Sequence, residues 1–227
     1  MPRQGVTDGL NSALNQAAAD LHLPMSPTQA GNLLAFLGLL HRWNATYNLT
    51  SVRDPAAMLT QHVADCLAVI APLRRYLVKD RSQRLLDVGS GGGLPGVVIA
   101  VMCPKLSVVC VDAVGKKAAF VRQVAAELRL NNLHGEHARV EAFDALPFDF
   151  VASRAFASLA DFSKLTRRHL APGAIWMAMK GKSPDAEVAA LPADVAVFHV
   201  EQLVVPGLDA ERCLVWMRPE PAAQTPV

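Results

Sequence analysis

Apolar side chains in the first third of the chain recur at the spacing of one helix face. Leu33, Leu37 and Leu40 lie three or four residues apart. The preceding segment 26–29, Ser-Pro-Thr-Gln, combines a capping serine, a proline at the first helical position and a glutamine three residues after the cap. A second helix is predicted over residues 54–70, where Asp-Pro begins another apolar face.

From about residue 84 onward, short apolar runs alternate with amphipathic segments. Such alternation predicts a mostly parallel, seven-stranded sheet with helices on both faces, which is an α/β Rossmann-like architecture. Strands are expected over 84–88, 107–112, a third run ending at 139–141, 148–153 and 174–180, with 195–204 and 212–217 as a closing antiparallel pair. Helices are expected over 97–102, 116–130 and 159–170.

The two patterns divide the chain into three parts. Residues 1–80 form an N-terminal helical segment that we expect to pack on the core. Residues 81–219 form the α/β domain, and residues 220–227, rich in proline and alanine, are expected to be a flexible tail.

Composition narrows the class of protein further. Hydrophobic residues make up 52% of the 227 positions and charged residues 19%, which fits a packed domain and excludes a disordered chain. The net charge of only +2 means that any nucleic-acid contact must come from a local basic patch.

The four cysteines and the apolar stretches indicate a cytoplasmic protein. The cysteines are scattered among apolar neighbours without metal-ligand spacing, so we expect inert core thiols and no metal site. The N-terminus lacks the apolar region of a signal peptide, and the apolar stretch 97–103 is too short to span a bilayer.

The strongest motif is a glycine cluster that directly follows the first predicted strand. It reads Asp87-Val-Gly-Ser-Gly-Gly-Gly-Leu-Pro-Gly96. Its second half fits the dinucleotide pattern G-x-G-x-x-G, which is weak evidence when it stands alone. Its first half, Gly89 to Gly93, fits G-x-G-x-G after an acidic residue. Asp87 would repel a pyrophosphate but can accept a hydrogen bond from the amino group of S-adenosylmethionine or from a water molecule, so the methyl-donor interpretation is favoured.

Asp112, at the end of the second strand, is the second candidate cofactor ligand. A carboxylate there can accept hydrogen bonds from both hydroxyls of a ribose. Both cofactors contain a ribose, so Asp112 supports the fold without choosing between them, and an ordinary strand-end aspartate is the alternative.

Several segments in order resemble the family of ribosomal RNA small subunit methyltransferase G, also called glucose-inhibited division protein B. The resemblance covers about residues 30–217. It rests on the glycine loop and on the segments 41–44 (HRWN), 47–50 (YNLT), 53–55 (RDP), 62–65 (HVAD), 115–117 (GKK), 139–141 (RVE), 153–157 (SRAFA) and 180–181 (KG). It implies a class I methyltransferase fold and methylation of N7 of a guanine in 16S rRNA (position 527 by the resemblance).

The resemblance also implies which residues bind the cofactor. Gly89, Leu94, Val140, Glu141 and Arg154 fall on the family's cofactor-binding positions. The glycine-loop argument adds four more: Asp87, Gly91, Gly93 and Asp112. The implied partner is 16S rRNA, the 30S subunit or an assembly intermediate, and the implied enzyme is a monomer.

Arg154 is also the candidate catalytic residue, acting by positioning rather than by acid–base chemistry. A lone charge after an apolar strand needs a partner. That partner can be the methionine carboxylate of the cofactor, an RNA phosphate, or a protein carboxylate such as Asp87. Phe156 can stack on a flipped base or pack in the core, and His62 can form a local hydrogen-bonded pair with Asp65.

Guanine N7 carries a lone pair and no proton, so direct in-line transfer needs no general base. Where exocyclic-amine methyltransferases carry Asn/Asp-Pro-Pro-aromatic, this chain has Ser-Arg-Ala-Phe at 153–156, which agrees with transfer to N7 rather than to an amino group.

A small-molecule methyltransferase, a nicotinamide-dependent dehydrogenase and a non-catalytic RNA-binding module are the alternative functions. The three consecutive glycines at 91–93 predict a loop that is looser than usual.

Overall fold

The computed structural model describes residues 2–154, 156 and 158–220, and it describes side chains from residue 8 onward. The strands are β1 (Gln83–Val88), β2 (Leu106–Asp112), β3 (Leu133–His137), β4 (Phe148–Ser153), β5 (Leu170–Lys180), β6 (Val195–Leu203) and β7 (Arg212–Pro219). The helices are α1 (Pro2–Asp20), α2 (Pro27–Tyr47), α3 (Pro55–Met58), α4 (Asp65–Leu67), α5 (Ile70–Arg74), α6 (Gly96–Met102), α7 (Gly115–Glu127), α8 (Leu159–Thr166) and α9 (Asp185–Ala189). A π-helical turn is η1 (Leu59–Ala64), and two 3-10 turns are η2 (Val140–Ala142) and η3 (Arg167–His169).

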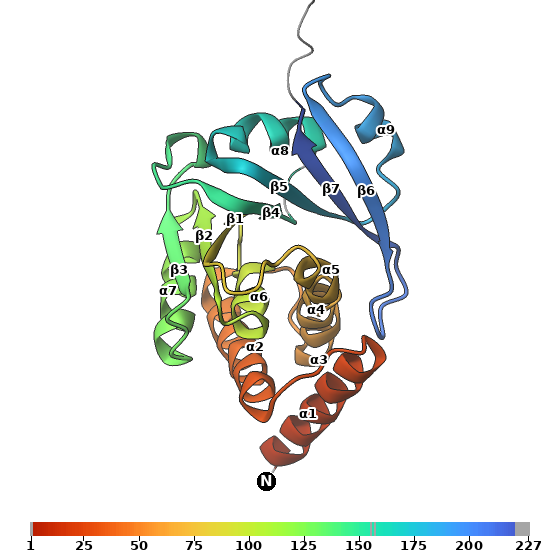
Figure 1. Ribbon diagram of the computed structural model, residues 1–227. Helices are drawn as coiled ribbons and strands as arrows, with labels where there is room; N and C mark the ends of the chain where they lie inside the picture. Colours follow the sequence, from red (N-terminus) through yellow and green to blue (C-terminus); the bar gives the residue numbers. More distant parts are fainter. Residues whose placement is uncertain (1, 155, 157, 221–227) are drawn as a thin grey trace, which may run out of the picture.

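The strands form one sheet in the order β3-β2-β1-β4-β5-β7-β6 (Figure 1). The first five of these strands are parallel, and β7 runs antiparallel to both of its neighbours. The strand order reverses between β1 and β4, so a crevice opens at the carboxyl ends of these two strands, where ligands bind in open α/β sheets. The predicted fold class is confirmed.

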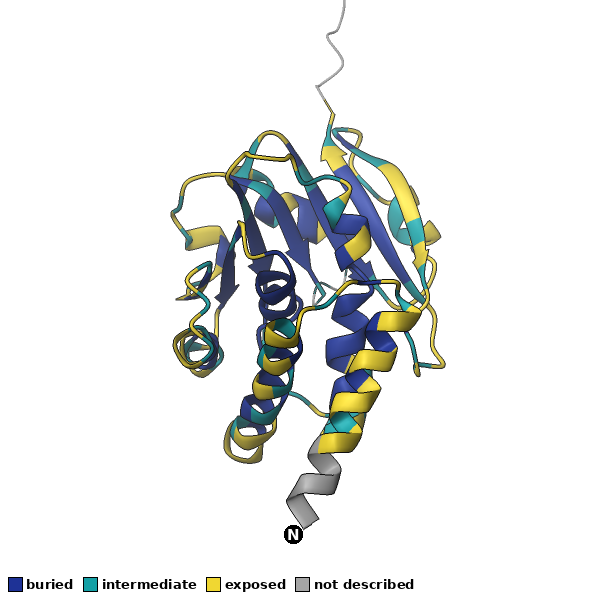
Figure 2. Ribbon diagram, turned by 60° about the horizontal axis from the view of Figure 1, so that its bottom comes forward, coloured by how far each residue is buried: buried dark blue, intermediate teal, exposed yellow. Residues whose placement is uncertain are grey.

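Both faces of the inner strands are buried, and the alternation of side chains along these strands supplies two cores. In β1, Leu85 belongs to the core beneath α2, α6 and α7, whereas Leu86 belongs to the core beneath α8. Figure 1 shows these helix layers on opposite sides of the sheet, and Figure 2 shows the inner strands as buried, whereas the edge strand β6 is largely exposed. The sheet can therefore present main chain to a ligand only at its edges and ends.

The start of α2 is as the sequence predicts. Ser26 caps the helix and forms a reciprocal capping box with Gln29, and Pro27 occupies the first turn. Asn48 ends the helix in the left-handed conformation, at φ 49°. Asp54 is the N-cap of α3, and its side chain accepts a hydrogen bond from the Ala57 amide.

Helix α1 is an element that the apolar pattern does not predict. Its buried positions include Leu14, Ala17 and Ala18. Alanine side chains leave only a weak apolar stripe, and the helix is held by packing against α2 and the η1 turn. Tertiary contacts, rather than sequence periodicity, define this helix.

The helix predicted over residues 54–70 is interrupted by a π-helical turn, η1. Residues Pro55–Arg74 are the one stretch in the described chain with the length and apolar composition to cross a membrane, and most of this stretch is buried inside the protein. Such burial is typical of the core helix of a globular domain.

Several element boundaries differ from the prediction. Strand β3 ends at His137, so residues 139–141 lie outside it, and Val140 and Glu141 belong to the η2 turn. Helix α7 ends at Glu127 instead of residue 130, because Arg129 adopts a positive φ of 52°. Helix α8 ends at Thr166, and β5 begins at Leu170 rather than at residue 174.

The helices before residue 80 share a continuous core with the sheet. Leu33, Phe36 and Leu40 of α2 belong to the same buried cluster as Leu85 of β1 and Phe120 of α7. This packing is compatible with the division at residue 80, which stays a proposal. Most of the predicted tail, residues 221–227, lies outside the described residues.

Close packing at Gly96 generates a prediction about stability. A methyl group at this position would overlap Sγ of Cys110 and would lie 2.8 Å from a carboxylate oxygen of Asp87. We expect Gly96→Ala to lower the free energy of unfolding by about 1–3 kcal/mol. Gly31→Ala is the matched control, because Gly31 lies in α2 with no atom within 4 Å of the added carbon; it should stabilise by about 0.5–1 kcal/mol. Equal urea midpoints for the two variants would contradict the packing argument.

Candidate active site

A cavity of about 280 Å³ opens at the crevice between β1 and β4. We call it the loop cavity. It is lined by the ends of β1 and β2, by the η2 turn and by two side chains from the opposite side: Val88, Gly89, Val111, Asp112, Ala113, Ala138, Arg139, Val140, Glu141, Phe156 and Leu165. Its lining is mainly apolar with a few polar groups, which suits a nucleoside.

The glycine loop owes its shape to backbone conformations that favour glycine. Gly89, Gly91 and Gly93 have φ values of 67°, 57° and 78°. Gly92 is explained by packing instead, because a methyl group there would lie 2.9 Å from Cδ1 of Leu40 in α2. Helix α2 covers the loop closely at the position where the sequence predicted looseness.

Asp112 ties the ends of β1 and β2 together. Its Oδ2 accepts a hydrogen bond from the Gly91 amide at 2.9 Å, and its Oδ1 accepts one from the Val114 amide at 2.8 Å. The ammonium group of Lys117 lies 3.8 Å from Oδ2. The carboxylate also lines the loop cavity, and each oxygen has a second lone pair available for a ribose hydroxyl.

Asp87 lies beneath the loop rather than in the cavity. The residue is fully buried, and its Oδ2 accepts a hydrogen bond from the Gly96 amide at 2.8 Å. Its Oδ1 has no hydrogen-bond partner among the described residues. Burial raises the pKa of Asp87 to about 7, against the opposing effects of the Gly96 hydrogen bond and of Arg154. Direct contact of Asp87 with a cofactor amino group stays a prediction.

The η2 turn is held against the cavity by residues that follow α8. His169 lies with Nε2 2.8 Å from the Val140 carbonyl oxygen, and Nη1 of Arg168 donates to the Glu141 carbonyl at 2.8 Å. Phe156 packs on Phe162 with ring centroids 5.2 Å apart while also lining the cavity. Phe156 therefore serves the core and the loop cavity together.

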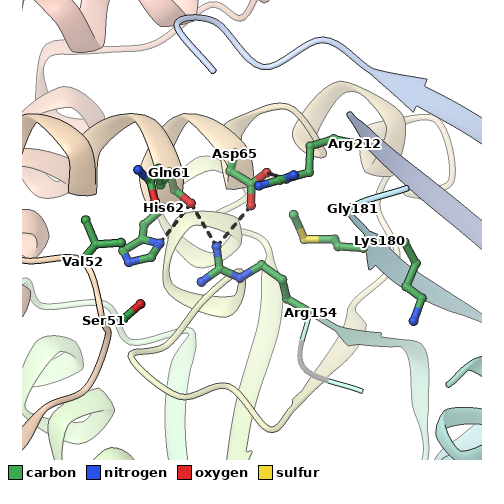
Figure 3. A pocket seen from close by; sticks show the side chains of 10 residues that line it. Ser51, Val52, Gln61, His62, Asp65, Arg154, Lys180, Gly181 and Arg212 are labelled. Carbon is green, nitrogen blue, oxygen red and sulfur yellow. Dashed lines mark hydrogen bonds and ion pairs between the residues drawn. The ribbon is translucent and has the colours of Figure 1, made fainter. Parts of the chain in front are cut away.

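A second cavity, of about 360 Å³, lies at the carboxyl ends of β4 and β5. We call it the edge cavity (Figure 3). Its lining is polar and apolar in about equal parts. It comes from the segment after α2, the η1 turn, the start of α4, the residue after β4, the end of β5 and the start of β7: Ser51, Val52, Gln61, His62, Asp65, Arg154, Met179, Lys180, Gly181 and Arg212.

Arg154 points across the edge cavity toward the N-terminal helices (Figure 3). Its Nη1 donates to Oδ2 of Asp65 at 3.1 Å and to the Gln61 carbonyl at 3.3 Å. Asp65, not Asp87, is the carboxylate that pairs with it. Burial acts to lower the pKa of Arg154, but neighbouring negative groups, Asp65 among them, outweigh burial and raise it above its ordinary value.

His62 and Asp65 do not form the predicted local pair, because their side chains are bonded to other partners. Nε2 of His62 lies 2.6 Å from the Thr50 hydroxyl, and Nδ1 lies 3.0 Å from the Gln61 carbonyl. Since a carbonyl only accepts, Nδ1 carries the proton. Burial, followed by the charge of Arg154, lowers the pKa of His62, so its ring is neutral at pH 7.

The structure divides the nine predicted site residues among three places. Gly89, Asp112, Val140 and Glu141 line the loop cavity. Arg154 lines the edge cavity, so the cofactor contact that the resemblance implies for it stays a prediction. The remaining four line neither cavity: Gly91, Gly93 and Leu94 are part of the loop, and Asp87 lies beneath it.

Sequence reasoning missed the pairing of Asp65 with both Arg154 and Arg212. A single carboxylate on an apolar helix was a possible signal for Asp65, because a buried charge requires a partner. The sequence carried no signal for Arg212, which is brought to the site by strand order alone.

The four cysteines are buried and free, as predicted. Burial raises the pKa of the Cys66 and Cys110 thiols, which keeps them protonated and unreactive. Within the described residues, no group of three or more His, Cys, Asp or Glu side chains could hold a metal ion.

Comparison with known proteins identifies the family. Residues 29–215 match the family model described as rRNA small subunit methyltransferase G. A protein of that name from Leptothrix cholodnii (strain ATCC 51168 / LMG 8142 / SP-6) is 62% identical over 208 residues, covering 92% of this chain and 95% of the relative. Its counterpart from Acidovorax ebreus (strain TPSY) is 59% identical over 218 residues, covering 92% and 96%. This chain belongs to the rRNA small subunit methyltransferase G family.

Solved structures similar to this member of the methyltransferase G family agree on the fold. An O-methyltransferase from Bacillus cereus, solved in complex with SAH, has a TM-score of 0.56 at 17% identity and covers 92% of this chain and 97% of its own. A SAM-dependent methyltransferase from Aquifex aeolicus has a TM-score of 0.54 at 19% identity, covering 75% and 96%. The family that the motifs resemble is confirmed by the family model and the relatives.

The buried carboxyl of Asp87 gives the stability of the free protein a pH dependence. Its pKa rises from an ordinary 3.8 to about 7 on folding, so the folded state holds the proton more tightly. The stability that this group contributes is complete below about pH 4 and is lost as the pH rises through about 7. We expect Asp87→Asn to remove this loss, which amounts to at most about 1.4 kcal/mol per pH unit. Urea unfolding of both proteins from pH 5 to 8 measures the difference, and a difference independent of pH would contradict the shift.

Proposed function

We propose that this chain transfers the methyl group of S-adenosylmethionine to N7 of a guanine in small-subunit ribosomal RNA. The observation that carries the proposal is the adjacency of two cavities at one end of the sheet. The segment after β4 lines both, since Arg154 faces the edge cavity and Phe156 faces the loop cavity. A methyl donor and an acceptor base need such adjoining sites.

The loop cavity fits the cofactor. Its floor is the bare main chain at Gly89, where a ligand can approach closely. Asp112 offers acceptors to ribose hydroxyls, and Val140 with Glu141 lines the adjoining side. The buried Oδ1 of Asp87, which has no partner among the described residues, is an acceptor that suits a nearby ammonium group or a water molecule. When bound, S-adenosylmethionine supplies an electrophilic methyl group on a sulfonium.

The edge cavity fits the acceptor. Guanine N7 has no proton, so no side chain has to remove one, and the neutral His62 can serve by position alone. The work of the chain is to hold the base in line and to exclude water. Arg154, Lys180 and Arg212 line this cavity, and their positive charges suit the electron-rich O6/N7 edge of guanine.

Contact with RNA is proposed for the mouth of the edge cavity. Exposed Arg53 follows the lining residues Ser51 and Val52, and exposed Lys182 follows Gly181. Two basic residues at one mouth can position an RNA backbone although the net charge of the chain is small. We propose a cytoplasmic monomer that acts on 16S rRNA, either within the 30S subunit or during its assembly.

The proposed reaction is tested with labelled S-adenosylmethionine and three acceptors: naked small-subunit RNA, 30S subunits and a set of small phenols and amines. We expect label at N7 of one guanine in at least one RNA acceptor and none in the small molecules. Label that reaches only a small molecule would replace the proposal with a small-molecule methyltransferase of the same fold.

Asp112→Ala tests the ribose contact. Loss of charge-assisted hydrogen bonds should weaken S-adenosylmethionine binding by about 1.5–3 kcal/mol, which raises Kd by roughly ten- to a hundredfold. Calorimetry measures this change. Asp20→Ala, an exposed carboxylate at the end of α1, is the control and should leave Kd unchanged. An unchanged Kd for Asp112→Ala would exclude a ribose role.

A further inference from the structure

Asp65 lies between two arginines that come from distant parts of the chain (Figure 3). Its Oδ2 accepts a hydrogen bond from Nη1 of Arg154 at 3.1 Å, and its Oδ1 accepts one from Nε of Arg212 at 2.9 Å. The Asp65 side chain is only 2% exposed, while those of Arg154 and Arg212 are 27% and 26% exposed. The carboxylate is therefore hidden behind its partners, which face the cavity.

This arrangement fixes the two guanidinium groups in place. Asp65 directly follows the π turn, whose Gln61 carbonyl also accepts a hydrogen bond from Arg154 at 3.3 Å. Arg212 is held a second time, because its Nη1 donates to the Glu211 carbonyl at 2.8 Å. Each arginine has thus lost much of its rotamer freedom before a ligand arrives, which lowers the entropy cost of binding.

The fixed groups give one wall of the edge cavity a distinct chemistry. Two guanidinium groups and one carboxylate leave one formal positive charge, and Asp65 shows its oxygens to the arginines rather than to the cavity. Guanidinium groups have five N–H donors and no acceptor. The wall therefore binds hydrogen-bond acceptors of a ligand and disfavours hydrogen-bond donors of a ligand.

We propose that Asp65 is a positioning residue that holds Arg154 and Arg212 as a donor-only wall, and that this wall selects a 6-oxopurine by its O6 acceptor. The inference rests on the proposed function and specifies how the base is chosen. Adenine presents an amino group where guanine presents O6, so its donor would face the donors of the wall. Contact with O6 leaves N7 on the same edge free to be methylated.

The test replaces the target guanine in the RNA acceptor with hypoxanthine, which keeps O6 and lacks the 2-amino group, or with 2-aminopurine, which lacks O6. Wild-type kcat/KM should be similar for guanine and hypoxanthine, and about ten- to a hundredfold lower for 2-aminopurine. In Asp65→Asn, kcat/KM with guanine should fall at least tenfold while kcat/KM with 2-aminopurine falls less. The ratio of kcat/KM for guanine to kcat/KM for 2-aminopurine should be at least fivefold smaller in Asp65→Asn than in the wild type. The intrinsic reactivities of the two bases are the same for both enzymes, so they do not affect this comparison.

Three further variants keep the outcome decisive. Asp149→Asn is the matched control, because Asp149 also pairs with an arginine, Arg81, at 2.6 Å, but in β4 at the opposite end of the sheet; its ratio should equal that of the wild type. Arg212→Gln should shrink the ratio as Asp65→Asn does, whereas Arg212→Lys should restore only part of it. If thermal melting shows that Asp65→Asn does not fold, the two Arg212 variants decide.

Failure of this inference is distinguishable from failure of the proposed function. Wild-type enzyme that labels guanine N7 while Asp65→Asn and Arg212→Gln keep the wild-type ratio would overturn the donor wall. An equal fall for guanine and 2-aminopurine would also overturn it, and would indicate that the arginines hold a phosphate. Absence of label at guanine N7 with the wild-type enzyme would instead refute the proposed function.

Discussion

Burial of both faces of the sheet is the constraint on which the rest of the structure depends. Helices cover the strands from either side, so the inner strands carry apolar residues at successive positions, as Leu85 and Leu86 show. Polar chemistry is left to the ends of the strands. Asp112, Arg154 and Lys180 each lie at or directly after a carboxyl end, and the two cavities lie there for the same reason.

Much of this arrangement could be predicted from the sequence, because its signals are local. The caps at Ser26 and Asp54 are encoded within four residues, and the glycine loop follows its strand without interruption. Asp112 could be identified because parallel strands place their carboxyl ends at one edge. These features require only the chain direction and the period of each element.

The remaining features depend on contacts between distant segments. The π turn at residues 59–64 has no sequence signature. The Thr50 partner of His62 and the two arginine partners of Asp65 come from other segments of the chain. Gly92 was interpreted as a source of looseness, but its neighbour is Leu40, more than fifty positions earlier in the chain. Arg154 was expected to need a negatively charged partner, and only the packed structure shows that Asp65 pairs with it.

The position of β7 has a consequence for how the protein is made. This strand is inserted between β5 and β6, and its first residue, Arg212, supplies part of the edge cavity. During synthesis the glycine loop and Asp112 leave the ribosome long before residue 212 does. Every residue that lines the loop cavity therefore precedes residue 212 in the chain, whereas the edge cavity lacks one of its arginines until that residue has been synthesised.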